Sequence, residues 1–255
     1  MTAFDNAAVM AVAKRQSAID LGCDPGDFDR DGPVVVESRA DPRARRYLRL
    51  PFACDLVSYG SNVVASVDAR HRGLVAGYLD GREPFRCFET PAIHRLDDAL
   101  RPHGLRVCFQ AEYFLPDPDR MTAAPCRYGT AVLGPDDFAG LYVDAWSNAL
   151  CAERPELDVL GVGAYDRGEL IGLAACSADC EDMWQIGVDV LPAYRRQGVA
   201  SALTGMLAAA ILERGKVPFY CCAWSNIPSA RNAIACGFRP AWAELTLRPE
   251  AECRF

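Results

Sequence analysis

The stretch Val188-Asp-Val-Leu-Pro-Ala-Tyr-Arg-Arg-Gln-Gly-Val-Ala-Ser-Ala-Leu203 joins a strand pattern directly to a helix pattern. Its first residues alternate and are rich in valine, which is typical of a strand. From Gly198 onward the apolar residues have helical spacing and continue to Leu212. No Ser, Thr, Asp or Asn stands directly before this helix, so the sequence offers no side chain to cap its first N–H groups.

The uncapped start predicts an anion site at the beginning of the helix. Unpaired N–H donors and the positive end of the helix dipole form a seat for a phosphate group. Gly198 lets the backbone approach an anion closely, and Arg195 and Arg196 add positive charge suited to phosphate oxygens. A P-loop is excluded because no Gly-Lys-Ser/Thr follows a longer glycine loop.

The bulk composition indicates a globular protein of one large or two small domains. The chain has 255 residues, of which 51% are apolar and 24% charged, with a formal net charge of −7. The acidic balance argues against nucleic acid as a partner, because phosphate neutralisation needs clustered Lys and Arg. No apolar run approaches the roughly 18 residues that span a bilayer, so no membrane partner is expected. The first 16 residues resemble an amphipathic helix more than a secretory signal, and we expect a cytoplasmic protein.

The cysteines do not predict a metal site. There are 12 cysteines and 3 histidines, and no two cysteines have the C-x-x-C spacing. Zinc sites usually take their ligands from tight pairs, so we expect no metal and treat the cysteines as small apolar core residues.

The first half of the chain is predicted to be a small α/β domain, residues 1–125. Its expected helices are residues 7–21, 70–80 and 91–103. Its expected strands are 34–37, two strands within 54–67 that turn at 60–62, and 105–114. The segment 115–125 has three prolines and is the best candidate for a linker.

The second half, residues 126–255, is predicted to be a separate domain with more sheet than helix. Its expected strands are 128–133, a hairpin formed by 158–165 and 170–176, 184–191, 218–224 and 238–247. Its expected helices are 136–152, 198–214 and a short capped helix after Ser225. The fold class is therefore α/β (α+β).

The hexapeptide Arg195-Arg-Gln-Gly198-Val-Ala200 matches the R/Q-x-x-G-x-G/A signature of the GNAT superfamily of N-acetyltransferases. The motif follows a strand that ends in Val188-Asp-Val190-Leu-Pro192, and Asn226 follows the next strand, with Gly237-Phe238 eleven residues later. Residues 128–247 resemble this superfamily in that arrangement. The resemblance implies a mixed, mostly antiparallel sheet flanked by helices, preceded here by an accessory domain with no assigned motif.

The resemblance also implies a site for acetyl-CoA as co-substrate. The strand backbone at Val188, Asp189 and Val190 would pair with the pantetheine arm like an additional strand. The N–H groups from Gln197 through Gly198, Val199 and Ala200 to Ser201 would hold the pyrophosphate, helped by Arg195 and Arg196. Asn226, with Ser229 nearby, would reach the cofactor from the following loop, although Asn226 also fits a helix cap and both roles can coexist.

The family's usual catalytic residues are missing from their expected positions. The usual carboxylate base falls at about Trp184, which leaves Glu181, Asp182, Glu112 and Glu244 as candidates, each also compatible with a solvated carboxylate. The usual tyrosine acid falls at Ala233, and Tyr220 is a candidate substitute or a core tyrosine. An acid is dispensable if the thiolate leaves unaided near neutral pH.

Three functions fit these features. The first is direct acetyl transfer from acetyl-CoA to a primary amine of a small molecule or peptide, in a monomer or a homodimer. The second is a non-catalytic acyl-CoA-binding or sensor module, and the third is a nucleotide-phosphate binder. The five arginines between Arg39 and Arg49 are expected to be a solvated charge run, or else to contact the cofactor's 3′-phosphate or an acidic substrate.

Overall fold

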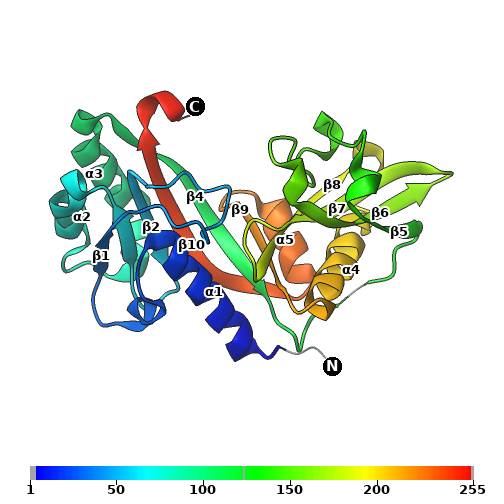
Figure 1. Cartoon of the computed structure of the whole chain (residues 1–255), viewed down its shortest axis with the longest axis horizontal. Coiled ribbons are helices and arrows are strands. Elements are labelled where there is room, and N and C mark those ends of the chain that lie inside the picture. The colour runs from blue at the N-terminus through cyan, green and yellow to red at the C-terminus, as the bar shows by residue number, and fades with distance from the viewer. Residues whose placement is uncertain (1–3, 123, 254–255) are drawn as a thin grey trace. The chain divides into compact units, whose positions relative to one another are not determined.

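The computed structural model of the chain describes residues 4–122 and 124–253 (Figure 1). The α-helices of these residues are α1 (Asn6–Leu21), α2 (Arg72–Leu79), α3 (Thr90–Leu100), α4 (Val199–Glu213) and α5 (Ile227–Ala235). The strands are β1 (Val34–Glu37), β2 (Cys54–Ser58), β3 (Val64–Val67), β4 (Leu105–Pro116), β5 (Gly129–Leu133), β6 (Asp158–Asp166), β7 (Glu169–Ser177), β8 (Met183–Val190), β9 (Val217–Ala223) and β10 (Phe238–Pro249).

The chain divides into two compact units. One contains the described residues up to Val12 together with Phe114–Pro240, and we call it the motif unit because it includes residues 188–203. The other contains Ala13–Tyr113 together with the described residues from Ala241 onward, and we call it the N-terminal unit. The long strands β4 and β10 each contribute residues to both units.

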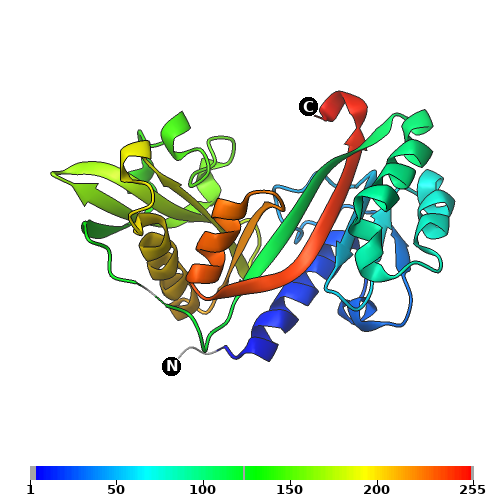
Figure 2. The same ribbon diagram turned by 180° about the vertical axis from the view of Figure 1, so that it is seen from behind.

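The sheet of the motif unit has the strand order β9-β8-β7-β6-β5. Neighbouring strands are antiparallel except for β8 and β9, which are parallel. Arg167 and Gly168 connect β6 to β7 with φ angles of 52° and 87°, as a two-residue hairpin turn requires. Figure 2 shows α4 and α5 on one face of these strands. The predicted mixed sheet flanked by helices is therefore confirmed.

Two apolar cores lie on the two faces of that sheet. On the helix side, Leu203, Leu207 and Ile211 of α4 are fully buried in a cluster that includes side chains of β6, β7 and β8. Burial of each such side chain stabilises the fold by roughly 1.5–3 kcal/mol. On the other face, Phe138 and Trp146 pack with Leu173 and other residues of the sheet. Residues 187–190 of β8 are thus held in a rigid setting.

The second face is not covered by the helix that the sequence predicts. The prediction of a helix over 136–152 is wrong, because the structure has only short 3₁₀ turns at Pro135–Phe138 and Asp144–Trp146. Gly140 adopts a φ of 83°, which ends helical geometry. The apolar residues that gave the segment its helical spacing are instead anchors that fix an irregular loop to the sheet.

The N-terminal unit has its own sheet, in the order β1-β3-β2-β10-β4. β1 is parallel to β3, whereas β2 is antiparallel to both β3 and residues 243–247 of β10. Leu96 and Leu100 of α3 are spaced four residues apart and are buried with Val75 of α2 and Leu245 of β10. Glu244 and Thr246 alternate with Leu245 and so point to the opposite face.

On that opposite face a buried charge cluster surrounds Arg45. Arg45 is 3% exposed and forms an ion pair with Asp20, and its guanidinium lies 3.8 Å from Glu244. Its carbon Cζ lies 5.7 Å and 5.8 Å from the ring centroids of Tyr113 and Trp242. The expectation of a solvated arginine run is therefore wrong at Arg45.

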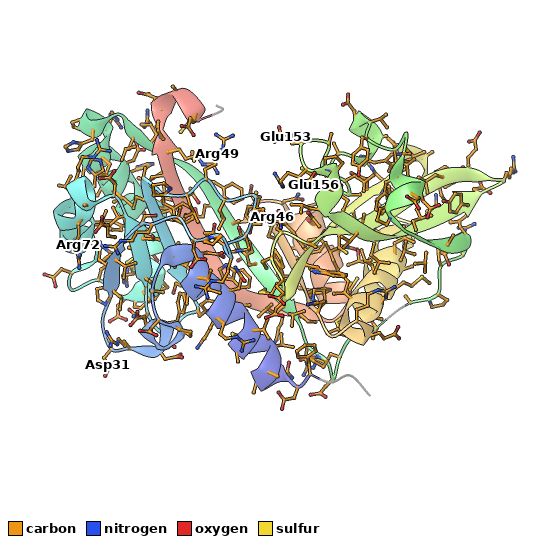
Figure 3. All side chains as sticks on the ribbon, in the orientation of Figure 1. Asp31, Arg46, Arg49, Arg72, Glu153 and Glu156 are labelled. Carbon is orange, nitrogen blue, oxygen red and sulfur yellow. The ribbon has the colours of Figure 1, made fainter. Side chains whose placement is uncertain are left out.

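Other members of the arginine run are exposed. Arg46 and Arg49 project from the ribbon as exposed side chains (Figure 3). Arg43 is also exposed, and its guanidinium lies 2.7 Å from the Asp41 carboxylate. Arg45, which lies beside buried carboxylates, is thus the buried arginine of this run.

The segment after β4 is attached to the motif unit. Asp117 N–H donates to Gly237 O at 3.0 Å, and Thr122 N–H donates to Cys236 O at 3.3 Å. The Asp117 carboxylate accepts from the Asn6 amide at 3.1 Å. Gly237 is required here, because its φ is +92° and a Cβ would lie 2.4 Å from Arg120 O.

We expect Gly237→Ala to reduce the free energy of unfolding by at least about 3 kcal/mol, since the added carbon meets backbone atoms in addition to the strain of a positive φ. Gly140→Ala is the matched control, because Gly140 has a φ of +83° and no atom within 4 Å of an added Cβ. The control should cost only the left-handed strain, about 1–2 kcal/mol. Urea unfolding of both variants measures the difference, and equal losses would contradict the backbone contact.

Candidate functional site

The central feature of the site is a separation of β8 from β9. On one edge β8 pairs with β7 as far as Val190, which lies opposite Gly172. On the other edge β8 pairs with β9 only from Met183 to Ile186, opposite Val217 to Tyr220. The backbone of residues 187–190 therefore has an edge that is not paired with β9. The separation of the two strands therefore begins after Ile186.

The loop after β8 leads into the start of α4. Arg196 has a φ of 59°, which is uncommon for a residue other than glycine, and Gly198 has a φ of 80°. No side chain caps α4, and the first helical bond is from Ala202 N–H to Gly198 O at 3.0 Å. A Cβ added to Gly198 would meet no protein atom within 4 Å. The helix therefore begins beside open space, as an anion seat requires.

Side chains around this loop hold its shape. The Tyr128 hydroxyl donates to Gln197 Oε1 at 2.7 Å, and Gln197 Nε2 donates to Ala193 O at 3.0 Å. The Tyr194 hydroxyl donates to Asp166 at 3.0 Å, which raises the pKa of Tyr194. Sequence reasoning missed Tyr128, Tyr194 and Asp166, which are far from Gln197 in sequence or outside the motif.

Three residues predicted to bind the cofactor have side chains that form hydrogen bonds within the protein. Arg195 Nε donates to Val190 O at 3.0 Å, so this guanidinium folds back on the strand. The Asp189 carboxylate accepts from Asn148 N–H at 2.8 Å, from the Asn148 amide at 2.7 Å and from Ala149 N–H at 3.0 Å. The Gln197 side chain is engaged as described above. Any contribution of Asp189 and Gln197 to binding is therefore through the main chain.

The other side of the opening is formed by the loop after β9 and by α5. Asn226 caps α5, its side chain accepting from Ser229 N–H at 3.3 Å. Ser201 Oγ donates to Asn232 Oδ1 at 2.9 Å, and Asn232 Nδ2 donates to Thr204 Oγ1 at 3.1 Å. The sequence analysis did not predict these hydrogen bonds between α4 and α5. The signal for them is Asn232, a partly buried asparagine within a helix.

Tyr220 lies at the point where the strands separate. It pairs in register with Ile186, and its hydroxyl is 2.9 Å from Ser229 Oγ. Burial raises the pKa of Tyr220. Ala233, where the resemblance predicts a tyrosine, is fully buried in the core cluster.

The carboxylate candidates are spread over the chain. Glu181 and Asp182 are exposed, and Asp182 Oδ1 lies 3.8 Å from Lys216 Nζ. Gly187 follows Asp182 by five residue steps, which span about 16.5 Å at 3.3 Å per residue in an extended strand. Glu112 is partly buried on β4, in the N-terminal unit. Glu244 is the fourth candidate and belongs to the buried Arg45 cluster. Two of the four candidates thus belong to the motif unit and two to the N-terminal unit.

A buried carboxylate that sequence reasoning missed is Asp158. It is 2% exposed, and its Oδ2 accepts from Cys151 N–H at 2.9 Å. It lies opposite Ser177, and Asp158 Oδ1 and Ser177 Oγ are both buried without a hydrogen-bond partner in the described structure. Burial raises the pKa of Asp158 to about 6. Its position at the first residue of β6 gave no signal in the sequence.

Asp158 should make stability depend on pH. Because its folded pKa of about 6 exceeds its ordinary value of 3.8, it contributes stability below about pH 4 that is lost as pH rises through 6. Asp158→Asn cannot ionise and keeps an acceptor for Cys151. We expect the fall in unfolding free energy from pH 4 to pH 7 to shrink by about 1 kcal/mol or more. Urea titrations at both values test this, with exposed Glu181→Gln as control; identical pH dependence in Asp158→Asn and the parent protein would refute it.

None of the helices formed by the described residues is long and apolar enough to cross a membrane. Among the same residues, no three His, Cys, Asp or Glu side chains are grouped so as to hold a metal ion.

Comparison with known proteins agrees with the motif. Residues 127–238 match the sequence model of the acetyltransferase (GNAT) family, so the motif unit contains a GNAT acetyltransferase domain. No curated protein matches the chain.

Three solved structures are similar to this chain over part of its length. A protein assigned to the GNAT acetyltransferase family from Novosphingobium aromaticivorans has 23% identity and a TM-score of 0.44, covering 56% of this chain and 66% of that one. A GCN5-related N-acetyltransferase-like protein from Streptococcus suis has 19% identity and a TM-score of 0.46, covering 62% and 69%. A GCN5-related N-acetyltransferase from Kribbella flavida has 18% identity and a TM-score of 0.46, covering 59% and 62%. The chain thus spans about two thirds of the length of these proteins.

Proposed function

We propose that the motif unit binds acetyl-CoA and transfers its acetyl group directly to a primary amine of a small molecule or peptide. The observation that carries the proposal is the unpaired edge of β8 leading into the uncapped start of α4. The GNAT domain supports acyl transfer in general. Beyond acyl transfer, we propose that the transferred group is acetyl from acetyl-CoA and that the acceptor is a primary amine.

The residues present fit this co-substrate. The backbone of Val188 and Val190 offers donors and acceptors to an extended amide arm on the edge that β9 leaves. The N–H groups of Val199, Ala200 and Ser201 lie in the first turn of α4, where no earlier residue of the helix accepts from them. Arg196 is exposed beside them and adds positive charge. Acetyl-CoA would supply an activated acetyl thioester at this site.

The acceptor must lose a proton before it attacks. An alkylammonium has a pKa near about 10, so a carboxylate or a water chain has to take its proton at neutral pH. Glu181, Asp182 and Glu112 remain candidates for this role. The negative charge of Glu181 and Asp182 would also attract a cationic amine.

A non-catalytic acyl-CoA-binding module is the second candidate function. Buried Ala233 in place of a tyrosine acid, and Trp184 near the usual position of the base, favour it. Release of CoA that depends on an added amine, measured over a panel of primary amines, separates the two functions. A thermal-shift comparison of acetyl-CoA, CoA and ATP separates both from a nucleotide-phosphate binder, which would be stabilised by ATP as well.

Gly198→Val tests the phosphate seat. The added side chain enters the space where backbone and pyrophosphate would meet, so acetyl-CoA affinity should fall at least about tenfold. Gly215→Val is the matched control: Gly215 follows the other end of α4, has a φ of +71°, and also has no atom within 4 Å of an added Cβ. Calorimetric titration of acetyl-CoA into both variants measures the effect. Unchanged affinity in folded Gly198→Val would eliminate the phosphate seat.

Tyr220→Phe tests whether a tyrosine acid is needed. With Ala233 at the family position, we expect kcat/KM to rise to a plateau with pH, without a fall near pH 10, because the thiolate leaves unaided. Tyr220→Phe should keep kcat within about twofold, since Tyr220 packs in the core and its hydroxyl bonds to Ser229. Ser229→Ala is the control that removes this partner and keeps the hydroxyl. A loss of more than about tenfold in kcat in Tyr220→Phe alone would assign the acid role to Tyr220.

A further inference from the structure

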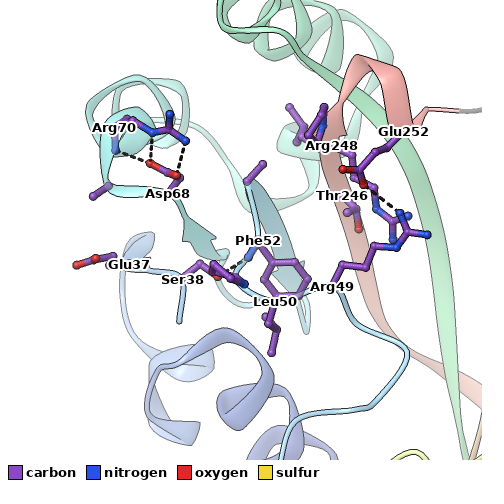
Figure 4. Close-up of a pocket in the computed structure, with 15 residues that line it drawn as sticks. Glu37, Ser38, Arg49, Leu50, Phe52, Asp68, Arg70, Thr246, Arg248 and Glu252 are labelled. Carbon is purple, nitrogen blue, oxygen red and sulfur yellow. Dashed lines mark hydrogen bonds and ion pairs between the residues drawn. The ribbon is translucent and has the colours of Figure 1, made fainter. Parts of the chain in front are cut away.

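The N-terminal unit contains a cavity that is separate from the phosphate seat. It has a volume of about 590 Å³ and lies between the ends of β1 and β3, the segment 49–53 and the end of β10 (Figure 4). Sites for small organic ligands commonly have volumes of about 300–1,000 Å³. We call it the Arg248 pocket, after the arginine that lines it from β10.

The carboxylates that line the pocket form ion pairs with arginines, whereas one arginine of the lining does not. Asp68 holds Arg70 through two side-chain bonds of 2.9 Å and 2.8 Å. Glu252 accepts from Arg49 at 3.0 Å, and Glu37 accepts from Arg39 at 3.3 Å. The carboxylates that line the pocket are thus all paired. Arg248, which is partly buried, forms no ion pair or side-chain hydrogen bond with any described residue. One positive charge is therefore left for a ligand.

Ser38 supplies a second donor. It is 8% exposed, and its Oγ accepts from Phe52 N–H at 2.7 Å, which leaves its hydroxyl proton without an acceptor among the described residues. Thr246, the other hydroxyl of the lining, already donates to Asp55 at 2.6 Å. Figure 4 shows Ser38 and Arg248 on opposite sides of the hollow, with Phe52 between them. Ser38 is thus a free donor on the wall opposite Arg248.

The remaining wall is apolar. Leu50 and Pro51 line the pocket with apolar side chains that are not fully buried, and a fully hydrated ion such as inorganic phosphate would leave this surface without a partner. A guanidinium matches a carboxylate through two parallel hydrogen bonds. We propose that the Arg248 pocket binds a small organic carboxylate, with its carboxylate on Arg248 and its apolar body against Leu50 and Pro51.

The test is calorimetric titration of the full chain with straight-chain carboxylates from butyrate to octanoate. At least one carboxylate should bind saturably with a Kd below about 1 mM, and its primary amide, which has the same shape without the charge, should bind at least about tenfold more weakly. Inorganic phosphate forms a separate arm and should not bind. Absence of carboxylate binding up to about 10 mM, or binding of phosphate alone, would overturn the proposal.

Variants locate the binding. Arg248→Gln should weaken the best carboxylate at least about tenfold, and Ala69→Phe, which adds bulk at an exposed lining position, should abolish binding. Arg46→Gln is the control, because Arg46 is exposed, does not line the pocket and pairs with none of its carboxylates. Gly198→Val should leave carboxylate binding unchanged, which separates this site from the proposed acetyl-CoA site. Equal affinity in the parent protein, Arg248→Gln and Ala69→Phe would refute the pocket as the site.

Discussion

Strands β8 and β9 run in parallel through Ile186 and Tyr220 and then part, and the rest of the motif unit is arranged around that separation. A strand edge without a neighbour has unsatisfied N–H and C=O groups, which in a sheet interior would be costly. Here the edge leads within a few residues to the start of α4, where further N–H groups are unpaired. An extended amide chain that ends in a phosphate satisfies both sets of groups. Such a chain is the ligand that the proposed function assigns to this opening.

Keeping such an opening rigid requires other residues to hold its walls. The Asp189 carboxylate fixes the loop at Asn148, and a Cβ at Gly187 would lie 1.8 Å from Asn148 O, so loop and strand are in close contact. Gln197 is held by Tyr128, and Asn232 joins α5 to α4. The side chains of the motif region therefore act mainly as supports, while the backbone presents the donors. A motif that specifies backbone shape tolerates substitution of its side chains more readily than one that specifies ligands.

The sequence predicts the features that local patterns determine, and it does not predict those that depend on tertiary contacts. The alternation before Pro192, the apolar spacing after Gly198 and the glycine between them are local signals, so strand, loop and helix were all predicted correctly. The helix over 136–152 was not, because Phe138, Trp146 and Leu150 pack against the sheet from an irregular loop, and helical spacing alone cannot exclude that. Arg45 is buried against Asp20, 25 residues earlier in the chain, and Asp158 lies opposite Ser177 of the next strand, and periodicity reveals neither pairing.

The N-terminal unit raises a question of charge balance that bears on its pocket. Asp20, Asp55 and Glu244 are all buried beside a single guanidinium, Arg45, and three ionised carboxylates would leave a net negative charge in the core. Burial raises the pKa of Asp55 and of Glu244, which opposes their ionisation, while Asp20 pairs with Arg45. Asp55 in turn accepts a hydrogen bond from the hydroxyl of Thr246, which lines the neighbouring cavity. The cluster thereby removes one donor from the cavity wall, and the recognition of an anion there falls to Arg248.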